Sequence, residues 1–292
     1  MHTMKWLLRI AAIVGLAGLL ASQLGEIHPI GDSLAVGRLP MAICATLLLL
    51  GFRYGRLMVF TGVVGIATLA WAFADRTWNT GPSGPIIVYQ KNLLFKNQDI
   101  NAVSDDIITT AADVVMLQEV TNLNRPILER LSPTFPTQIL CPRNRSFGVA
   151  VLSKYPRTTA SAICTTRLAA IQVTTSTGPA WVVSLHLHWP YPFRQDTQLK
   201  QVIAQLSDLQ GPIILAGDLN MVPDTRIDRA LSKATGTQSL RNAMATFFLG
   251  PIPFAIDRVF AQCGTVRRGE LLGSDHHGLI ANVGIDSETC GG

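Results

Sequence analysis

Apolar residues are concentrated in the first 76 residues of this 292-residue chain, and that asymmetry divides it in two. Only 15% of all residues are charged, against about 25% in a typical soluble domain. Three early segments are nearly free of charge: 6–24, 39–52 and 57–74. A membrane-spanning helix needs roughly 20 mainly apolar residues, which the first and third segments supply. The second reaches that length only if Arg38 lies at the membrane interface.

These segments predict a membrane anchor over residues 1–76 with three transmembrane helices. A cleaved signal peptide is the alternative for the first segment, and Arg9 within the apolar run argues against it. Lys5, Arg53 and Arg56 mark the cytoplasmic ends, because cytoplasmic flanks are rich in Lys and Arg. We therefore predict an integral protein of the inner or plasma membrane, with residues 77–292 on the extracytoplasmic side.

The cysteines are consistent with an oxidising compartment. Cys141, Cys164, Cys263 and Cys290 follow the anchor, and an even number permits two disulfides. Four cysteines allow three pairings, of which sequence proximity favours Cys141–Cys164 and Cys263–Cys290. None has C-x-x-C or His-linked spacing, so a zinc site is not expected.

Beyond the anchor, turn-forming residues predict a linker over 77–85, followed by a single domain over 86–286 and a tail over 287–292. Strand-like apolar runs alternate with helical patches throughout this domain. The expected strands cover 86–89, 114–117, 147–152, 160–164, 168–174, 180–187, 213–216, 255–261 and 279–283, and the expected helices 99–112, 124–131, 195–210 and 225–234. This order predicts an α/β fold, a four-layered sandwich of two packed β-sheets flanked by helices.

Polar side chains of the kinds that phosphate chemistry requires follow or interrupt several of these apolar runs. The run 213–216 breaks at Gly217 and then presents Asp218 and Asn220, which point the same way from a strand end. Similar placements occur for Asn92, Glu119, His186 with His188, Asp257, and Asp275 with His276. Groups held at one edge of a sheet form a rigid site.

The ordered motifs QKN, LQEV, SFGVAVLSKYP, VVSLHLHWP, ILAGDLN, AIDRVF and GSDHHGLI resemble the endonuclease/exonuclease/phosphatase superfamily over about residues 86–285. The resemblance implies a metal site and a catalytic group. Glu119 would be the main Mg²⁺ ligand, with Asn92 and Asp275 near the metal. His186 would contact the phosphate, Asp218 and Asn220 would hold water and phosphate, and Asp257 would pair with His276.

Two positions depart from that family pattern. Leu94 stands where some members have a second acidic residue, which leaves the number of metals open. Arg258 follows Asp257 where an aromatic residue or His is often found, so Arg258 is a candidate contact for an anionic substrate.

The implied chemistry is divalent-metal-dependent phosphoester hydrolysis without a covalent nucleophile. Oxygen ligands favour Mg²⁺, with Mn²⁺ or Ca²⁺ as alternatives, and the cation offsets repulsion between the carboxylates and an anionic substrate. The general base is either Asp218 or His276. His186 would donate a proton or hydrogen bond to the phosphoryl oxygens or the leaving group.

The substrate class is predicted from location and from two aromatic segments, 189–193 and 247–254. His188 and Trp189 are further candidate substrate contacts. Residues 77–292 carry 18 Lys and Arg against 16 Asp and Glu, too weak a field to favour duplex DNA. We expect a phospholipid or small phosphoester, with the membrane bilayer as partner and no obligate protein partner. The alternatives are a nuclease acting on DNA or RNA and a catalytically silent binding or signalling module.

Overall fold

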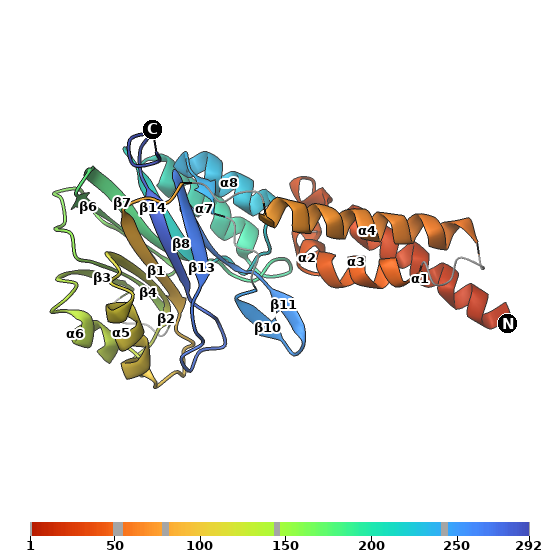
Figure 1. Ribbon diagram of the computed structural model, residues 1–292, viewed down its shortest axis with the longest axis horizontal. Coiled ribbons are helices and arrows are strands. Elements are labelled where there is room, and N and C mark those ends of the chain that lie inside the picture. The colour runs from red at the N-terminus through yellow and green to blue at the C-terminus, as the bar shows by residue number, and fades with distance from the viewer. Residues whose placement is uncertain (1, 49–54, 78–81, 143–146, 241–244, 292) are drawn as a thin grey trace.

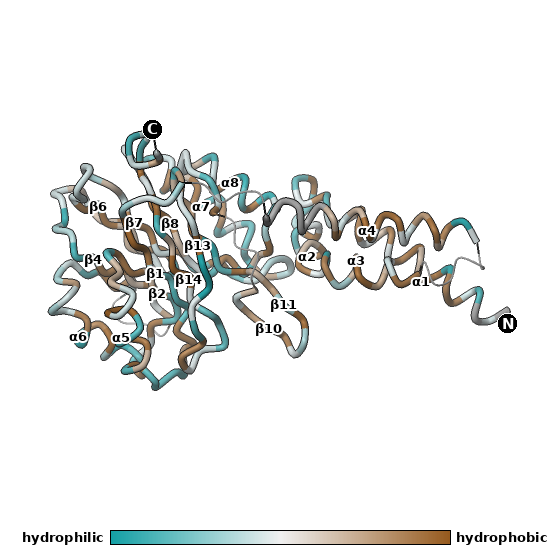
Figure 2. The backbone as a smooth tube through the Cα atoms, in the orientation of Figure 1, coloured by the Kyte–Doolittle hydropathy of each residue, from teal (hydrophilic) through white to brown (hydrophobic). Residues whose placement is uncertain are grey.

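The computed structural model describes residues 2–48, 55–77, 82–142, 147–240 and 245–291. Its helical N-terminal part projects from the sandwich as an arm (Figure 1). The arm contains α1 (His2–Ala21), the 3-10 turn Leu24–Glu26, α2 (Ile30–Val36), α3 (Arg38–Leu47) and α4 (Arg56–Thr77). All three predicted apolar segments therefore contribute helices, and the arm is mainly hydrophobic (Figure 2).

The described helices do not establish whether the three predicted segments cross a membrane. None of them alone combines the length and apolar character needed to cross a membrane, whereas α2 and α3 do so only as a pair bent by 63°. The end of the predicted 39–52 segment, Arg53 and residues 78–81 of the linker lie outside the described residues. The membrane anchor thus stays a prediction.

The arm contacts the sandwich through α2. Arg226 forms ion pairs with Asp32 of this helix at 2.7 Å and with Asp196 at 2.8 Å. The Ser33 hydroxyl donates a hydrogen bond to the carbonyl oxygen of Tyr191 at 2.6 Å. Because Asp32 is buried and Tyr191 belongs to the aromatic 189–193 segment, the arm is joined to a loop that borders the site described below.

Two six-stranded mixed sheets form the centre of the domain. The first has the order β13-β14-β1-β2-β4-β3, and the second β5-β6-β7-β8-β12-β9. The first comprises Cys263–Arg268, Leu279–Gly284, Ile86–Asn92, Val114–Val120, Gly148–Ser153 and Thr137–Cys141 in that order. The second comprises Ile163–Cys164, Leu168–Thr175, Gly178–His186, Ile213–Asp218, Asp257–Ala261 and Gln238–Ser239. A separate hairpin contains β10 (Phe247–Leu249) and β11 (Ile252–Phe254).

Helices cover the outer face of each sheet. α5 (Ile100–Thr109) and α6 (Pro126–Leu131) pack on the first sheet, and α7 (Gln195–Ser207) and α8 (Arg226–Thr235) on the second. Strand residues divide by alternation: Ile86 and Val88 enter the core between the sheets, while Tyr89 enters the core under α5 and α6. The expected four-layered sandwich is confirmed.

The sequence predicts the layered architecture more completely than it predicts the individual strands. β3, β13 and the β10–β11 hairpin had not been predicted as strands, and the expected strand 160–164 is reduced to Ile163–Cys164. The strand 213–216 does not break at Gly217 but continues to Asp218. A Cβ atom at Gly217 would overlap the carbonyl oxygen of Leu185 on β7, so the glycine permits close strand contact.

Both favoured disulfides are present. Cys141–Cys164 links β3 of one sheet to β5 of the other, and Cys263–Cys290 ties the predicted tail to β13. Their sequence separations are 23 and 27 residues. The free Cys44 is exposed on α3.

Replacing Cys141 and Cys164 together by serine is expected to lower the free energy of unfolding by about 3 kcal/mol, because the open chain gains loop entropy on unfolding. Denaturant titration of the full chain in detergent measures this loss. Cys44→Ser is the control and should leave the unfolding midpoint unchanged. An unchanged midpoint in the double variant would contradict the structural role of this disulfide.

Candidate active site

Strand order brings the predicted polar residues to one edge between the two sheets. β1 and β2 run parallel, as do β7 and β8, so their carboxyl ends lie on the same side. Asp218 at the end of β8 is in register with His186 of β7 and with Asp257 of the antiparallel β12. These five strands, together with the loop between β13 and β14 that carries Asp275 and His276, supply the site from separate segments of the chain.

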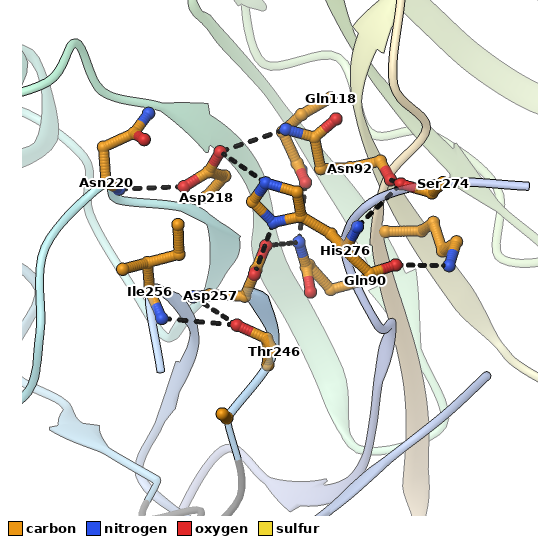
Figure 3. Close-up of polar contacts among 12 residues, drawn as sticks. Gln90, Asn92, Gln118, Asp218, Asn220, Thr246, Ile256, Asp257, Ser274 and His276 are labelled. Carbon is orange, nitrogen blue, oxygen red and sulfur yellow. Dashed lines mark hydrogen bonds and ion pairs between the residues drawn. The ribbon is translucent and has the colours of Figure 1, made fainter. Parts of the chain in front are cut away.

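Asp218, Asp257 and His276 form its buried centre (Figure 3). His276 Nδ1 is hydrogen-bonded to Asp257 Oδ2 at 2.8 Å, and His276 Nε2 lies 3.8 Å from Asp218 Oδ2. Asp218 Oδ2 also accepts a hydrogen bond from the Asn92 amide at 3.0 Å. Its Oδ1 accepts the backbone N–H of Asn220 at 2.8 Å. This arrangement fixes the carboxylate of Asp218 beside the imidazole.

A polar chain across the otherwise apolar core orients Asp257 (Figure 3). The Gln90 amide donates to Asp257 Oδ1 at 2.8 Å and to Gln118 Oε1 at 2.7 Å. Gln118 in turn donates to the Ser184 hydroxyl at 2.9 Å. All these groups are fully buried, so each missing hydrogen bond would carry a desolvation cost. Sequence reasoning missed these residues, although both glutamines lie within the quoted QKN and LQEV motifs.

Electrostatics assign different protonation to the central groups. Burial opposes a charged His276, but the carboxylates of Asp257 and Asp218 outweigh burial and raise its pKa to about 10. Burial raises the pKa of Asp218 to about 7, with Asp257 adding to the rise and His276 opposing it. For Asp257, burial is overcome by His276, which lowers the pKa of the carboxyl. His276 is therefore cationic at neutral pH, and Asp218 is able to gain or lose a proton.

Two of the predicted site residues have an unusual backbone conformation. Glu119 has a φ of 56° at a bulge between β2 and β4, and Asn220 has a φ of 49°. Positive φ is costly for non-glycine residues and is concentrated at functional sites. Both side chains line a cavity of about 260 Å³ at the edge of the two sheets. Asp218, Asp275 and His276 line the same cavity, so most of the predicted metal and catalytic groups converge there.

Of the remaining predicted residues, some line this cavity and others do not. His186, His188 and Trp189 line the cavity, and Nδ1 of the buried His186 has no hydrogen-bond partner among the described residues. Burial, followed by the charge of Arg167, lowers the pKa of His186, which is thus neutral. Asn92 lies behind Asp218 and its amide oxygen accepts the N–H of Leu94.

Arg258 does not lie where the sequence suggested. It is buried, its Nη1 donates to the Asp257 carbonyl oxygen at 2.7 Å, and its Nε lies 3.8 Å from Asp228 on α8. Neighbouring strand residues point to opposite faces, so a β12 that turns Asp257 inward turns Arg258 toward the helices. Arg258 is therefore not positioned to contact a substrate in the cavity.

Two cationic residues of the site, Lys91 and Arg167, were not predicted from the sequence. The fully buried Lys91 ammonium donates to the carbonyl oxygens of Glu270, Leu271 and His276 at 2.6–2.8 Å, and so holds the loop that carries His276. Arg167 lines the cavity, and its carbonyl oxygen accepts the N–H of His186 at 2.9 Å. No periodic pattern distinguishes either residue from a surface cation in the sequence.

The donor set of this cavity fits a hard divalent cation. Glu119 is half-buried and Asp275 is exposed at the mouth, and both supply carboxylate oxygens beside Asp218. Asp218, Asp257 and His276 also form a tight cluster, with ligand atoms within 4.8 Å of one another. A metal between Asp257 and His276 would displace their hydrogen bond, so Glu119 and Asp275 are the carboxylates of this cavity that could hold a metal without breaking it.

The fold and the site together define a class of hydrolases built on two packed sheets with carboxylate and histidine groups at one edge. Residues 77–276 match the model of the Endonuclease/Exonuclease/phosphatase family. The chain belongs to this family. A search of curated proteins found no match.

Solved structures agree at the level of the fold. An endonuclease/exonuclease/phosphatase from Beutenbergia cavernae is 18% identical, with a TM-score of 0.55 and coverage of 69% of this chain and 72% of that one. D. rerio TDP2 complexed with a single-strand DNA product is 17% identical (TM-score 0.53; coverage 67% and 97%). A mutant beta toxin from Staphylococcus aureus with bound magnesium ions is 12% identical (TM-score 0.52; coverage 68% and 100%).

Proposed function

We propose that this protein is a divalent-metal-dependent phosphoester hydrolase that acts on a phospholipid or small phosphoester outside a membrane. The observation that carries the proposal is the buried Asp218–His276–Asp257 cluster beside a carboxylate-lined cavity. Family membership and the magnesium ions bound to the beta toxin support it. In this proposal Glu119 and Asp275 hold the metal, and Asn92 supports Asp218 through its amide.

The proposed mechanism divides the work among residues with different charges. Asp218 takes a proton from the attacking water, because it is buried and its pKa lies near neutrality. His276, kept cationic by Asp257, stabilises negative charge on the phosphoryl oxygens. His186 donates a hydrogen bond to the same group or to the leaving oxygen, and Asn220 orients the phosphate. The metal, when bound, neutralises charge on a phosphoryl oxygen.

Exposed aromatic residues beside the cavity support a lipid substrate. Trp189 is 44% exposed and Phe193 63%, in the loop that follows His188. Phe248 and Leu249, at the tip of the β10–β11 hairpin, are also exposed, and the hairpin projects on the same side of the sandwich as the helical arm (Figure 1). An apolar surface of this kind is suited to a membrane interface. Insertion of the arm in a bilayer would bring this side of the domain toward the headgroups.

A substrate panel tests the proposal against its rivals. The full chain in detergent with Mg²⁺ is incubated with phospholipid vesicles, inositol phosphates, plasmid DNA and RNA. We expect release of headgroup or inorganic phosphate from the lipid or small phosphoesters, with slower nucleic acid cleavage. Dominant cleavage of DNA or RNA would favour the nuclease alternative. If none of these phosphoesters is hydrolysed, the catalytically silent binding or signalling module is the remaining alternative.

The proposed topology is tested separately. A reporter that is active only in the cytoplasm is fused after Gly292, and a second that is active only outside is fused at the same point. We expect activity from the second alone, because the cationic flanks Lys5, Arg9 and Arg56 orient the arm with the domain outside. A cytoplasmically active fusion would overturn the extracytoplasmic assignment without affecting the proposed chemistry.

A further inference from the structure

A second and larger cavity adjoins the candidate active site. It has a volume of about 520 Å³ and lies between residues 165–167, which precede β6, and the first turns of α7. Phe147, Arg167 and His188 line both cavities. The two spaces are therefore neighbours, with Arg167 and His188 at their boundary, and a molecule longer than one phosphoester can enter both.

The second cavity differs sharply in charge from the first. Glu119, Asp218 and Asp275 line the catalytic cavity, whereas no acidic residue is among the described residues that line the second. Its charged residues are Arg167 and Arg194, and the rest of its polar lining consists of threonine, glutamine and histidine side chains. Burial and then the charges of Arg167 and Arg194 lower the pKa of His188, which reflects the positive potential there.

The two arginines are available to a ligand. Within the described part of the chain, neither the half-buried Arg167 nor the exposed Arg194 uses its guanidinium in a hydrogen bond or ion pair. Gln198 on the same wall is instead engaged on both sides: it donates to the His186 carbonyl at 2.9 Å and accepts the His188 N–H at 2.7 Å. The wall is thus fixed by Gln198. The guanidinium groups of Arg167 and Arg194 line the cavity without a hydrogen bond to any described residue, and the charge of Arg167 also acts on Glu119 and Asp218. This arrangement suits phosphate oxygens.

We propose that this second cavity binds a second phosphate group of the substrate, next to the phosphoester held in the catalytic cavity. The proposal rests on the proposed phosphoester hydrolase function and narrows its substrate to compounds with at least two phosphate groups. Arg194 is the main specificity residue in this assignment. Arg167 contacts both spaces and joins the two phosphate positions.

Binding of matched phosphate compounds tests this assignment by calorimetry on the full chain in detergent. The first pair is thymidine 5′-phosphate and thymidine 3′,5′-bisphosphate, and the second is inositol 1-phosphate and inositol 1,4-bisphosphate. We expect the bisphosphate to bind about tenfold more tightly in at least one pair, the increment typical of a charge-assisted hydrogen bond. The pair that shows the preference distinguishes a nucleotide source from a lipid-headgroup source.

Arg194→Gln should abolish the preference, and the exposed Arg267→Gln on β13, which removes the same charge elsewhere, should retain it. Equal affinities within both pairs, or a preference that survives in Arg194→Gln, would overturn the assignment. Hydrolysis of bis(p-nitrophenyl) phosphate, which has a single phosphate, reports on the proposed function alone. Turnover of that compound without bisphosphate preference would reject only the second phosphate position.

Discussion

Asp218→Asn is expected to lower kcat/KM for a phosphodiester about 10³-fold, the range found when a general base loses its proton-accepting group. An asparagine has the size of the aspartate and its oxygen can still accept the N–H of Asn220. It cannot take a proton from water. Steady-state hydrolysis of bis(p-nitrophenyl) phosphate with Mg²⁺ measures the effect, and Asp105→Asn, at an exposed ion pair with Arg130, serves as the control.

The same variant should not be destabilised. The folded state raises the pKa of Asp218 to about 7, so the folded protein binds a proton more readily than the unfolded chain. Stability therefore decreases as the pH rises from the unfolded pKa toward 7, because a buried charge must form. Removing that charge offsets the loss of the acceptor for the Asn92 amide, so the unfolding midpoint at pH 7.5 should change little. Wild-type activity in Asp218→Asn would remove this residue from the proposed mechanism.

Asp257→Asn is expected to lower kcat/KM about 10²-fold and to change its dependence on pH. Asp257 accepts a hydrogen bond from His276 at 2.8 Å and helps raise the pKa of His276 to about 10. His276 acts as a cation, so activity is present below its pKa and is lost as the pH rises through it. Without the Asp257 charge this pKa falls, and the alkaline decline should begin at lower pH.

A full pH–rate profile of both proteins tests that shift. Asp257→Glu restores a carboxylate and should recover part of the alkaline range, whereas a mere packing defect would not be rescued in this way. An alkaline limb at the same pH in wild type and Asp257→Asn would show that Asp257 does not control the charge of His276.

The layered architecture and much of the site were accessible from the sequence because both depend on local patterns. Short apolar runs ending in a polar residue predicted the strands and the residues at their ends, such as Asp218 and His186. The edge strand β3 and the β10–β11 hairpin were missed because they lack a long buried run: β3 is mostly half-buried, and Leu249 is 62% exposed. Strands of this kind are defined by their partners rather than by their own hydrophobicity.

The site residues that the sequence did not predict are held by contacts between residues that are far apart in the chain. Gln90 contacts Asp257 across 167 residues of chain and Gln118 across 28, and no local pattern marks either glutamine. Lys91 is a buried lysine whose three carbonyl partners lie about 180 residues away. The position of Arg258 could have been corrected from the sequence, because strand alternation places it opposite Asp257.

In the proposed function, a divalent metal at Glu119 and Asp275 enables phosphoester hydrolysis in the cavity of Asp218 and His276. Its most direct test is turnover of bis(p-nitrophenyl) phosphate by the full chain before and after treatment with excess EDTA, followed by addition of Mg²⁺, Mn²⁺ or Ca²⁺. We predict that activity disappears with EDTA and returns with Mg²⁺. Full turnover in excess EDTA would contradict a role for a divalent metal in the hydrolysis.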